Sequence, residues 1–407
     1  MINMHGMTAQ SEKPITTEPP NLVYNSKSLG QMLSHLARQT LIAIDTESDS
    51  YFAYSPKVCL IQISVYADPA VADPMQVVDY LVDPLRLHDL SRLGILLEQP
   101  QLEVVMHAAD NDILQLQRDF GFRFDNLFDT QLAARILGWR NVGLAPLLEE
   151  HFGVISDKRM QRTDWSVRPL TPQQIAYAQM DTHYLFALRS LLLEHLAASD
   201  RLEEAQNGFS QLARLAASAR TANSRSFWQM KVTRSVDRSL TGVLEALWEW
   251  REQEAQRLNR PPFRVMGDET LAALASRQPA TLQEFSAVQG MTPHQVNRYG
   301  QAVLAAIQEG VRRPLPDLPA ATIRPEMMLD KSQYACYERL RRWRTETAER
   351  RGVGPEIVFN NDTLLQIAQV APRNESDLAS IEDVGSWKAK TYGASVLAVL
   401  GDARSDR

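Results

Sequence analysis

Cysteine is scarce in this chain, and long apolar runs are missing from it. The 407 residues include two cysteines, Cys59 and Cys336, which lie far apart in the sequence. Such a pair suggests neither a disulfide framework nor a zinc site, so we expect a reducing compartment, the cytoplasm. Without any run of about 18 apolar residues, we expect no membrane-spanning helix. The N-terminal stretch has no basic start followed by an apolar core, so we expect no secretory signal.

A net positive charge is also missing. The net charge is −6, which argues against a protein that binds polyanions nonspecifically. Residues 1–200 carry 24 acidic and 15 basic side chains, and residues 201–407 carry 25 and 28, giving net charges of −9 and +3. This asymmetry suggests that the two parts have different roles, although compositional drift is the simpler explanation.

The first half of the chain mixes strand and helix patterns. Short runs rich in Val and Ile predict strands at 41–47, 58–66, 77–84 and 103–109. Apolar residues three and four apart predict helices at 112–121, 129–139 and 144–153, and one long helix at 171–198 that begins with Thr171 and Pro172. We therefore expect an α/β domain with a mixed sheet.

The second half predicts helices only, and it contains an internal repeat. Residues 250–307 match residues 343–400 at a constant offset of 93, with Trp250-Arg251 on Trp343-Arg344 and Tyr299-Gly300 on Tyr392-Gly393. Two copies of one small helical domain explain this match. The expected organisation is a tail at 1–21, an α/β domain at 22–205, a helical linker at 206–238, helical domains at 239–313 and 331–402, a Pro-rich linker at 314–330 and a tail at 403–407.

The apolar run at 41–44 leads directly into acidic residues. Asp45 and Glu47 point to the same face of the expected strand, about 7 Å apart at a rise of roughly 3.3 Å per residue. Carboxylates this close repel each other. Asp112, in the first turn of a helix, and Asp181, four residues after Tyr177, supply two more. A hard divalent cation, Mg²⁺ or Mn²⁺, best explains such a cluster.

Taken singly, each of these residues fits a simpler role. Asp112 alone would be a helix N-terminal acid, and Tyr177 alone would be a half-buried core residue. The complete ordered set is what favours a metal-dependent site.

Three motifs in this order resemble those of the DEDDy 3′–5′ exonucleases. They are Asp45-x-Glu47, His107-x-Ala109-x-x-Asp112 and Tyr177-x-x-x-Asp181. The stretches FDTQLAARIL and DKRMQRTDWSVRPLT more specifically resemble the ribonuclease D family. The helical repeats are similar to its two HRDC (helicase and RNase D C-terminal) domains, although GVGPEIVFNNDTL makes the second copy more diverged. The resemblance implies a ribonuclease H-like mixed-sheet exonuclease domain followed by two all-α HRDC bundles.

The resemblance also implies a role for each motif residue. Asp45 would bridge two metal ions, Glu47 and Asp181 would complete the site that activates the attacking water, and Asp112 would hold the second ion largely through waters. Two such ions stabilise the attacking and leaving oxygens of an in-line displacement. Tyr177 would orient the attacking water, and the product would be a nucleoside 5′-monophosphate.

Other residues in the first half leave alternatives open. For His107 a satisfied core histidine is favoured over a metal ligand. Asp129 fits an N-cap better than a support for a metal ligand. Arg162, Asp164 and Trp165 are candidates to line the substrate path, with Trp165 stacking on a base, or else Trp165 anchors an ordered loop.

Basic residues gather in the second repeat. Arg339, Arg341, Arg342, Arg344, Arg350 and Arg351 fall on its first helix, and Lys388 and Lys390 follow near its end. A solvated face is the usual explanation, but phosphate contacts are plausible because the α/β domain is net acidic. Trp250 and Trp343 fit packing within each repeat better than base stacking.

These observations predict a 3′–5′ exoribonuclease, a monomer without membrane association, with two bound Mg²⁺ or Mn²⁺ ions. From the resemblance comes the expected substrate, tRNA precursors or other small structured RNAs. One alternative is an exonuclease that acts on DNA. The other is a nucleic-acid-binding scaffold without activity, against which the intact acidic residues and Tyr177 argue.

Overall fold

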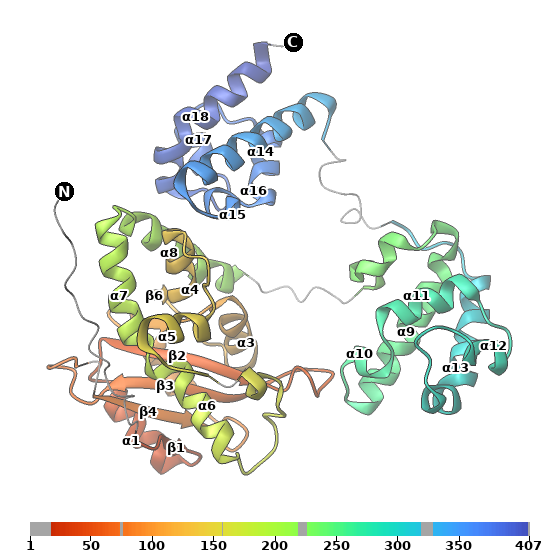
Figure 1. The fold of residues 1–407 in the computed structure, drawn as a ribbon, viewed down its shortest axis with the longest axis horizontal. Helices are drawn as coiled ribbons and strands as arrows, with labels where there is room; N and C mark the ends of the chain where they lie inside the picture. Colours follow the sequence, from red (N-terminus) through yellow and green to blue (C-terminus); the bar gives the residue numbers. More distant parts are fainter. Residues whose placement is uncertain (1–17, 74–75, 157, 219–225, 319–328, 406–407) are drawn as a thin grey trace, which may run out of the picture. The chain divides into compact units, whose positions relative to one another are not determined.

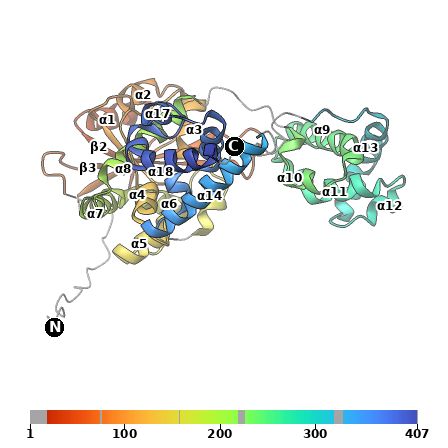
Figure 2. The same cartoon turned by 90° about the horizontal axis from the view of Figure 1, so that it is seen from above.

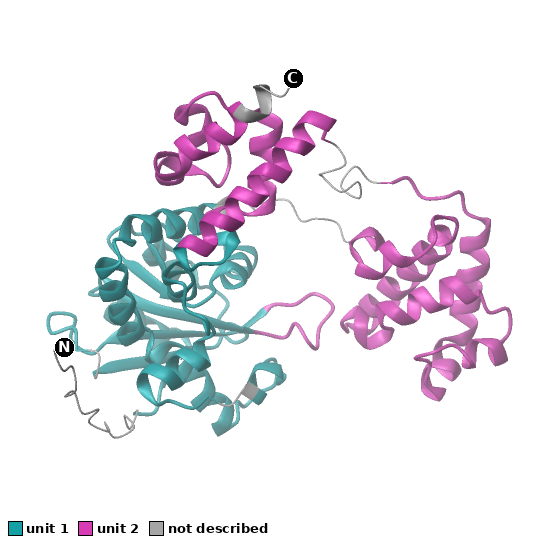
Figure 3. Cartoon of the chain, turned by 45° about the horizontal axis from the view of Figure 1, so that its top comes forward, with its two compact units in different colours: residues 1–47, 58–218, 351–357 teal, residues 48–57, 219–350, 358–407 magenta. Residues whose placement is uncertain are grey.

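The computed structural model describes residues 18–73, 76–156, 158–218, 226–318 and 329–405. The chain divides into two compact units, which Figure 3 colours separately. Unit 1 comprises residues 1–47, 58–218 and 351–357, and unit 2 comprises residues 48–57, 219–350 and 358–407. Within the described ranges, no helix combines the length and the apolar character needed to cross a lipid bilayer.

Unit 1 is built on a six-stranded mixed sheet (Figure 1). The sequence predicts the mixed sheet and four of its strands, β2 to β5, but not β1 or β6. The strands are β1 (Asn21–Val23), β2 (Leu41–Ser48), β3 (Val58–Tyr66), β4 (Val77–Val82), β5 (Glu103–Met106) and β6 (Leu127–Asp129), and their order is β1-β4-β3-β2-β5-β6. β3 and β4 are antiparallel, whereas β1 with β4, β2 with β5, and β5 with β6 are parallel. The strand β2, which carries Asp45 and Glu47, therefore lies inside the sheet.

Both faces of this sheet are covered. Ile42 and Ile44 of β2 pack into one apolar cluster, and the intervening Ala43 packs into another. This alternation explains why β2 begins with an unbroken apolar run. The helices of unit 1 are α1 (Ser26–Leu36), α2 (Ser91–Leu97), α3 (Asp110–Phe120), α4 (Thr130–Leu137), α5 (Leu144–Phe152), α6 (Pro172–His183), α7 (Leu185–Ala198) and α8 (Leu202–Ser218), with a 3₁₀ helix at Lys158–Arg162.

The long helix predicted at 171–198 is broken at Tyr184. Thr171 caps α6 and Pro172 begins it, as expected, but Tyr184 has φ −94° and ψ 0° and separates α6 from α7. The two halves pack on different partners, because α6 contacts β3 and β4 whereas α7 contacts α4 and β5. The change of direction lets a continuous helix-forming sequence cover two parts of the domain.

The region expected as a helical linker packs against unit 1 at its start and against the first helical repeat at its end. Helix α8 packs against α3, α4 and β6 of unit 1. Residues 219–225 lie outside the described part of the chain. Beyond them, Phe227, Met230 and Val232 are buried in the core of the first helical repeat. Most of the expected linker thus belongs to one domain or the other.

Unit 2 contains the first helical repeat and most of the second, whose residues 351–357 belong to unit 1. The first consists of α9 (Thr241–Leu258), α10 (Pro262–Val265), α11 (Asp268–Arg277), α12 (Leu282–Ser286) and α13 (Pro293–Arg312). The second consists of α14 (Lys331–Arg351), α15 (Pro355–Val358), α16 (Asn361–Val370), α17 (Glu375–Ala379) and α18 (Gly385–Ser405). Helices α10, α11 and α12 map onto α15, α16 and α17 at the predicted offset of 93 residues, without a gap.

Equivalent side chains pack the interior of each repeat. The ring of Trp250 meets Tyr299 edge-on at 5.5 Å, and Trp343 meets Tyr392 in the same way at 5.8 Å. The second pair joins α14 to α18, which lie side by side in Figures 1 and 2. Packing of each repeat, rather than base stacking, is therefore the role of both tryptophans.

Two short segments belong to a different unit from their chain neighbours. Residues 48–57, between β2 and β3, lie in unit 2, where the Tyr54 hydroxyl donates to Glu252 at 3.0 Å. Residues 351–357 lie in unit 1, where Arg351 forms an ion pair with the buried Glu204 (2.9 Å from Nη1 to Oε1).

The expected tails and the Pro-rich linker are described only in part. Residues 1–17 and 319–328 lie outside the described ranges. The last residue of the expected N-terminal tail, Asn21, begins β1 (Asn21–Val23). At the other end α18 continues to Ser405, so residues 403–405 are helical rather than a tail.

Candidate active site

Three carboxylates from two elements of unit 1 converge on one point. Asp45 and Glu47 project from β2, and Asp181 projects from α6. One oxygen from each lies within 4.8 Å of the other two. The Oδ2 atom of Asp181 is buried and has no hydrogen-bond partner among the described residues. An all-oxygen set with an unsatisfied buried ligand atom fits a hard divalent cation.

The electrostatics of this cluster also favour a cation. Burial, with the nearby charges of Asp181 and Asp112, raises the pKa of Glu47 to about 9. Burial and the charge of Asp112 raise the pKa of Asp181 to about 8, against the hydrogen bond from Tyr177. The pKa of Asp45 is raised well above its ordinary value, first by burial and then by its acidic neighbours. The cluster is thus costly to ionise without a positive charge.

Asp112 lies at the start of α3, as predicted, next to this group. Its Oδ1 accepts a hydrogen bond from the hydroxyl of Thr46. Burial raises the pKa of Asp112 to about 6, and this hydrogen bond opposes the increase. Asp112 is near enough to raise the pKa of Asp45, but it is not one of the three residues whose oxygens meet within 4.8 Å.

Tyr177 and Asp181 lie on the same face of α6, as their spacing predicts. Tyr177 donates a hydrogen bond to the Asp181 carboxylate, and the Gln161 amide donates to the phenolic oxygen of Tyr177. Burial and three nearby carboxylates raise the pKa of Tyr177, so the phenol stays protonated. Its hydroxyl is therefore held by contacts on both sides.

A cavity of about 390 Å³ gives access to these groups. Asp45, Tyr177 and Asp181 line one side, and apolar residues of α5 with Met180 line another, including Leu144, Ala145, Pro146 and Leu148. A binding site with an apolar wall beside a few polar groups suits a nucleotide base and its phosphate.

His107 also lines this cavity. Its Nδ1 lies 2.9 Å from the hydroxyl of Thr130, and burial lowers its pKa to about 4. A side-chain partner thus holds the imidazole, and it is not among the three residues of the carboxylate group. The imidazole Nε2, however, is buried without a hydrogen-bond partner among the described residues, so the favoured interpretation of a satisfied histidine holds for one ring nitrogen only.

Asp129 is the N-cap of α4, the role that the sequence favours. Its carboxylate accepts from the backbone N–H of Leu132 at 2.8 Å and of Ala109 at 2.7 Å. Because Ala109 immediately precedes α3, Asp129 also fixes the start of the helix that carries Asp112.

Two candidate residues of the QRTDW stretch, Arg162 and Trp165, differ in exposure to solvent. Arg162 is exposed at the end of the 3₁₀ helix. Trp165 is completely buried and packs on Tyr177 with ring centroids 6.2 Å apart. A base cannot stack on a ring that protein covers on all sides. The structure therefore favours the alternative in which Trp165 anchors this loop behind Tyr177.

The basic residues of the second repeat differ in their contacts, and two of them, Arg344 and Arg351, hold other parts of the protein. Nη1 of Arg344 donates to the carbonyl of Phe359 and to Asn361, both at 2.9 Å. Arg251 makes the equivalent contacts in the first repeat, to the carbonyl of Met266 and to Asp268. Arg344 is thus used to hold its own repeat together, which argues against a phosphate contact. Arg351 is likewise used, on Glu204.

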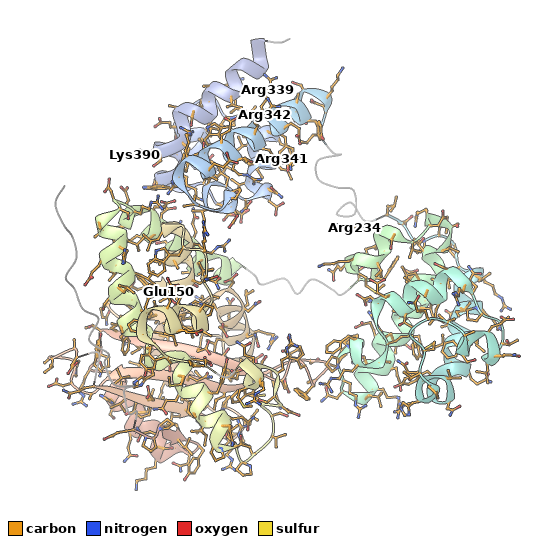
Figure 4. All side chains as sticks on the ribbon, in the orientation of Figure 1. Glu150, Arg234, Arg339, Arg341, Arg342 and Lys390 are labelled. Atoms are coloured by element: carbon orange, nitrogen blue, oxygen red, sulfur yellow. The ribbon has the colours of Figure 1, made fainter. Side chains whose placement is uncertain are left out.

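The other basic side chains lie on or near the surface of the repeat. Arg341 and Arg342 are exposed on α14, Arg339 is half-buried there, and Lys390 is exposed on α18; Figure 4 labels all four. Arg341 pairs with Glu338 at 2.8 Å, and Lys388 lies over the ring of Phe359 at 5.3 Å. We call Arg339, Arg341, Arg342 and Lys390 the basic face.

Sequence reasoning missed two residues of the site, Thr46 and Gln161. Thr46 lies between Asp45 and Glu47 in β2. Strand alternation predicts that its side chain points to the opposite face, but its hydroxyl donates a hydrogen bond to Asp112. Gln161 lies one position before the candidate Arg162. Neither residue type forms a chemical pattern, so only the folded geometry identifies them.

Comparisons with known proteins agree with this geometry. The model of the 3′–5′ exonuclease family matches residues 20–197, and that of the HRDC domain matches residues 241–307 and 333–400. Ribonuclease D of Gluconacetobacter diazotrophicus is 31% identical over 387 residues, which cover 95% of this chain and 93% of that protein. The chain belongs to the ribonuclease D family. It is a 3′–5′ exoribonuclease, and the predicted resemblance to this family is confirmed.

Further relatives support the same assignment. Ribonuclease D of Granulibacter bethesdensis is 31% identical over 382 residues, covering 93% of this chain and 92% of that protein. The solved structure of Escherichia coli RNase D matches with a TM-score of 0.66 at 23% identity, covering 95% of this chain and 99% of that one. The expected fold class, a mixed-sheet exonuclease core followed by helical HRDC domains, is therefore confirmed.

Proposed function

We propose that this enzyme trims the 3′ ends of tRNA precursors and other small structured RNAs, releasing nucleoside 5′-monophosphates. The observation that carries the proposal is the convergence of Asp45, Glu47 and Asp181 beside Tyr177 in one cavity. RNA as the substrate follows from membership of the ribonuclease D family. The preference for structured RNA rests on the family resemblance and on the two HRDC domains.

The catalytic set in this proposal is Asp45, Glu47, Asp112, Tyr177 and Asp181. Asp45, Glu47 and Asp181 would hold one divalent ion, and Asp112 with Asp45 would hold a second, with Mg²⁺ or Mn²⁺ as the metals. When bound, two such ions neutralise charge on the attacking and leaving oxygens and make a bound water more acidic.

The protein itself supplies orientation at this site. Tyr177 keeps its proton, because its pKa is raised, and its hydroxyl is aimed by Gln161 and Asp181. It would orient the attacking water. The apolar wall of α5 would pack against the terminal base, which would place its phosphodiester beside the carboxylates.

Outside the cavity, we propose that the basic face contacts RNA phosphates. Because the exonuclease half is net acidic, binding of a polyanion needs positive charge supplied from elsewhere. We further propose that the enzyme is a monomer and that it is cytoplasmic. Two free, buried cysteines far apart in the sequence fit a reducing compartment.

A time course on 5′-labelled RNA and matching single-stranded DNA, with Mg²⁺, Mn²⁺ or EDTA, tests the proposal. We expect one-nucleotide shortening of RNA from its 3′ end and no reaction in EDTA. A tRNA with a 3′ trailer should be trimmed to a defined end, with nucleoside 5′-monophosphate as product. Faster shortening of DNA, or activity in EDTA, would contradict the proposal.

A further inference from the structure

Helix α6 is buried on two opposite faces. At about 100° per residue, Tyr177 and Asp181 are about 40° apart around the helix, and Gln179 and His183 form a second pair roughly opposite them. All four side chains are buried. Tyr177 and Asp181 line the cavity, whereas Gln179 and His183 contact Asp79 of β4, on the side where α6 packs on β3 and β4.

A single buried carboxylate meets this second face. Asp79 of β4 is 4% exposed. Its Oδ2 accepts from Gln179 Nε2 at 2.7 Å and lies 2.8 Å from His183 Nδ1. Its Oδ1 accepts from the hydroxyl of Ser64, its cross-strand partner on β3, at 2.6 Å. The Ser64 hydroxyl is also hydrogen-bonded to that of Thr182 at 2.7 Å.

These contacts fix α6 to the sheet by polar bonds of defined geometry. Gln179, Thr182 and His183 surround Asp181 in the sequence, so the rotation of the helix at this turn decides where Asp181 points. On the cavity side, Asp181 lies beside the carboxylates of β2. The hydrogen bonds of Asp79 hold the opposite face of α6, so they oppose a rotation or shift that would move Asp181 away from these groups.

We propose that Asp79 is a positioning residue, which acts through α6 to hold Asp181 where a divalent ion can bind it. The inference rests on the proposed use of a metal at Asp45, Glu47 and Asp181. It assigns to Asp79 a role in metal affinity, beyond the stability that any buried hydrogen-bonded carboxylate provides.

The test is Asp79→Asn in the full-length protein, which conserves volume but replaces an accepting oxygen with a donor. We expect the Mg²⁺ concentration for half-maximal activity to rise about 10-fold, as when a partner of a metal ligand is removed. The KM for RNA at saturating Mg²⁺ should not change. The rise in Tm that Mg²⁺ causes, measured without RNA, should shrink at a given Mg²⁺ concentration.

Asp83→Asn is the matched control. Asp83 is also buried, follows β4 directly and accepts from Arg168 at 2.7 Å, but within the described part of the chain it makes no hydrogen bond to α6. The substitution should lower the Tm without changing the Mg²⁺ dependence. Gln179→Met removes one donor to Asp79 and should raise the Mg²⁺ concentration for half-maximal activity less than Asp79→Asn does. If Asp79→Asn does not fold, Gln179→Met is the test variant in its place.

The outcomes separate the inference from the proposed function. If the wild-type protein shows neither metal-dependent shortening of RNA nor a Mg²⁺-dependent Tm, the proposed metal use fails. If the wild type behaves as proposed but Asp79→Asn, or Gln179→Met in its place, keeps the wild-type Mg²⁺ dependence at a lowered Tm, then Asp79 is only structural and the inference is overturned.

Discussion

Tyr177 donates a hydrogen bond to Asp181 one helical turn further along α6 while accepting one from Gln161. The bond stabilises the Asp181 anion, which burial disfavours, and it fixes the direction of the phenol. The two residues therefore act as one unit at the edge of the cavity.

Replacing Tyr177 by Phe should distinguish the orientation of the attacking water from the binding of metal. We expect kcat to fall about 100-fold, the lower end of what positioned proton-transfer groups contribute. The Mg²⁺-dependent change in Tm should stay, because no metal ligand is removed. Gln161→Ala should lower kcat less than Tyr177→Phe. A Tyr177→Phe enzyme with wild-type kcat would remove the hydroxyl from the mechanism.

Asp45→Asn should abolish hydrolysis while RNA binding stays close to that of the wild type. Asp45 is a ligand in the proposed metal site, so the loss of activity should exceed the roughly 10- to 100-fold caused by removing a partner of a metal ligand. Asp110→Asn, at an exposed acid of the same region, is the control and should keep full activity. Single-turnover rates and filter binding measure the two properties, and comparable turnover in Asp45→Asn would exclude Asp45 from the site.

The raised pKa values predict how stability depends on pH. Without metal, the folded chain binds protons at Asp112, Asp181 and Glu47 more tightly than the unfolded chain, because their folded pKa values are about 6, 8 and 9. The free energy of unfolding should therefore decrease as pH rises through this range. Mg²⁺ competes with these protons, so its stabilising effect should grow with pH.

Thermal unfolding in EDTA and in Mg²⁺, followed from about pH 6 to about 9, measures this effect. Asp181→Asn provides the comparison, since it removes one titrating carboxyl and should flatten the pH dependence in EDTA. Identical slopes in the wild type and the variant would show that Asp181 does not titrate in this range.

Charge reversal on the basic face tests its contact with RNA. Arg342→Glu should weaken binding of structured RNA and reduce the slope of log K against log salt by about 1 for each phosphate that the protein no longer neutralises. Cleavage of a short single strand should be affected less. Equal effects on both substrates would argue against a gripping role for this face.

Arg344→Ala should behave differently from Arg342→Glu. It removes two hydrogen bonds within the second repeat, so we expect destabilisation of about 1–3 kcal/mol. The salt dependence of RNA binding should not change. Arg251→Ala is the equivalent change in the first repeat and should destabilise as well. A reduced salt slope in Arg344→Ala at unchanged Tm would restore Arg344 as a candidate for phosphate binding.

The sequence predicts most of the fold and the carboxylate cluster because both depend on periodic patterns. Asp45 and Glu47 are two residues apart in a strand, and Tyr177 and Asp181 are four apart in a helix, so spacing alone aligns each pair. The break at Tyr184 has no such signal, since helix-forming residues continue through it and tertiary packing decides the change of direction.

Residue spacing also does not predict whether a side chain is buried or exposed. Trp165 suits a stacking platform and a buried anchor equally, and only the surrounding protein excludes the first. For Arg344 a signal was present in the sequence. Arg344 aligns with Arg251, and the acid at Asp268 aligns with Asn361, which indicates an arginine that caps the next helix of its own repeat.

The two repeats share several packing residues but differ at other positions. The edge-on Trp–Tyr pair and the capping arginine recur at the 93-residue offset, whereas Arg341 takes the place of Trp248 and Lys388 that of Gln295. Such a pattern is what duplication of one ancestral segment leaves. The two copies thus share one packing scheme while they present different side chains around it.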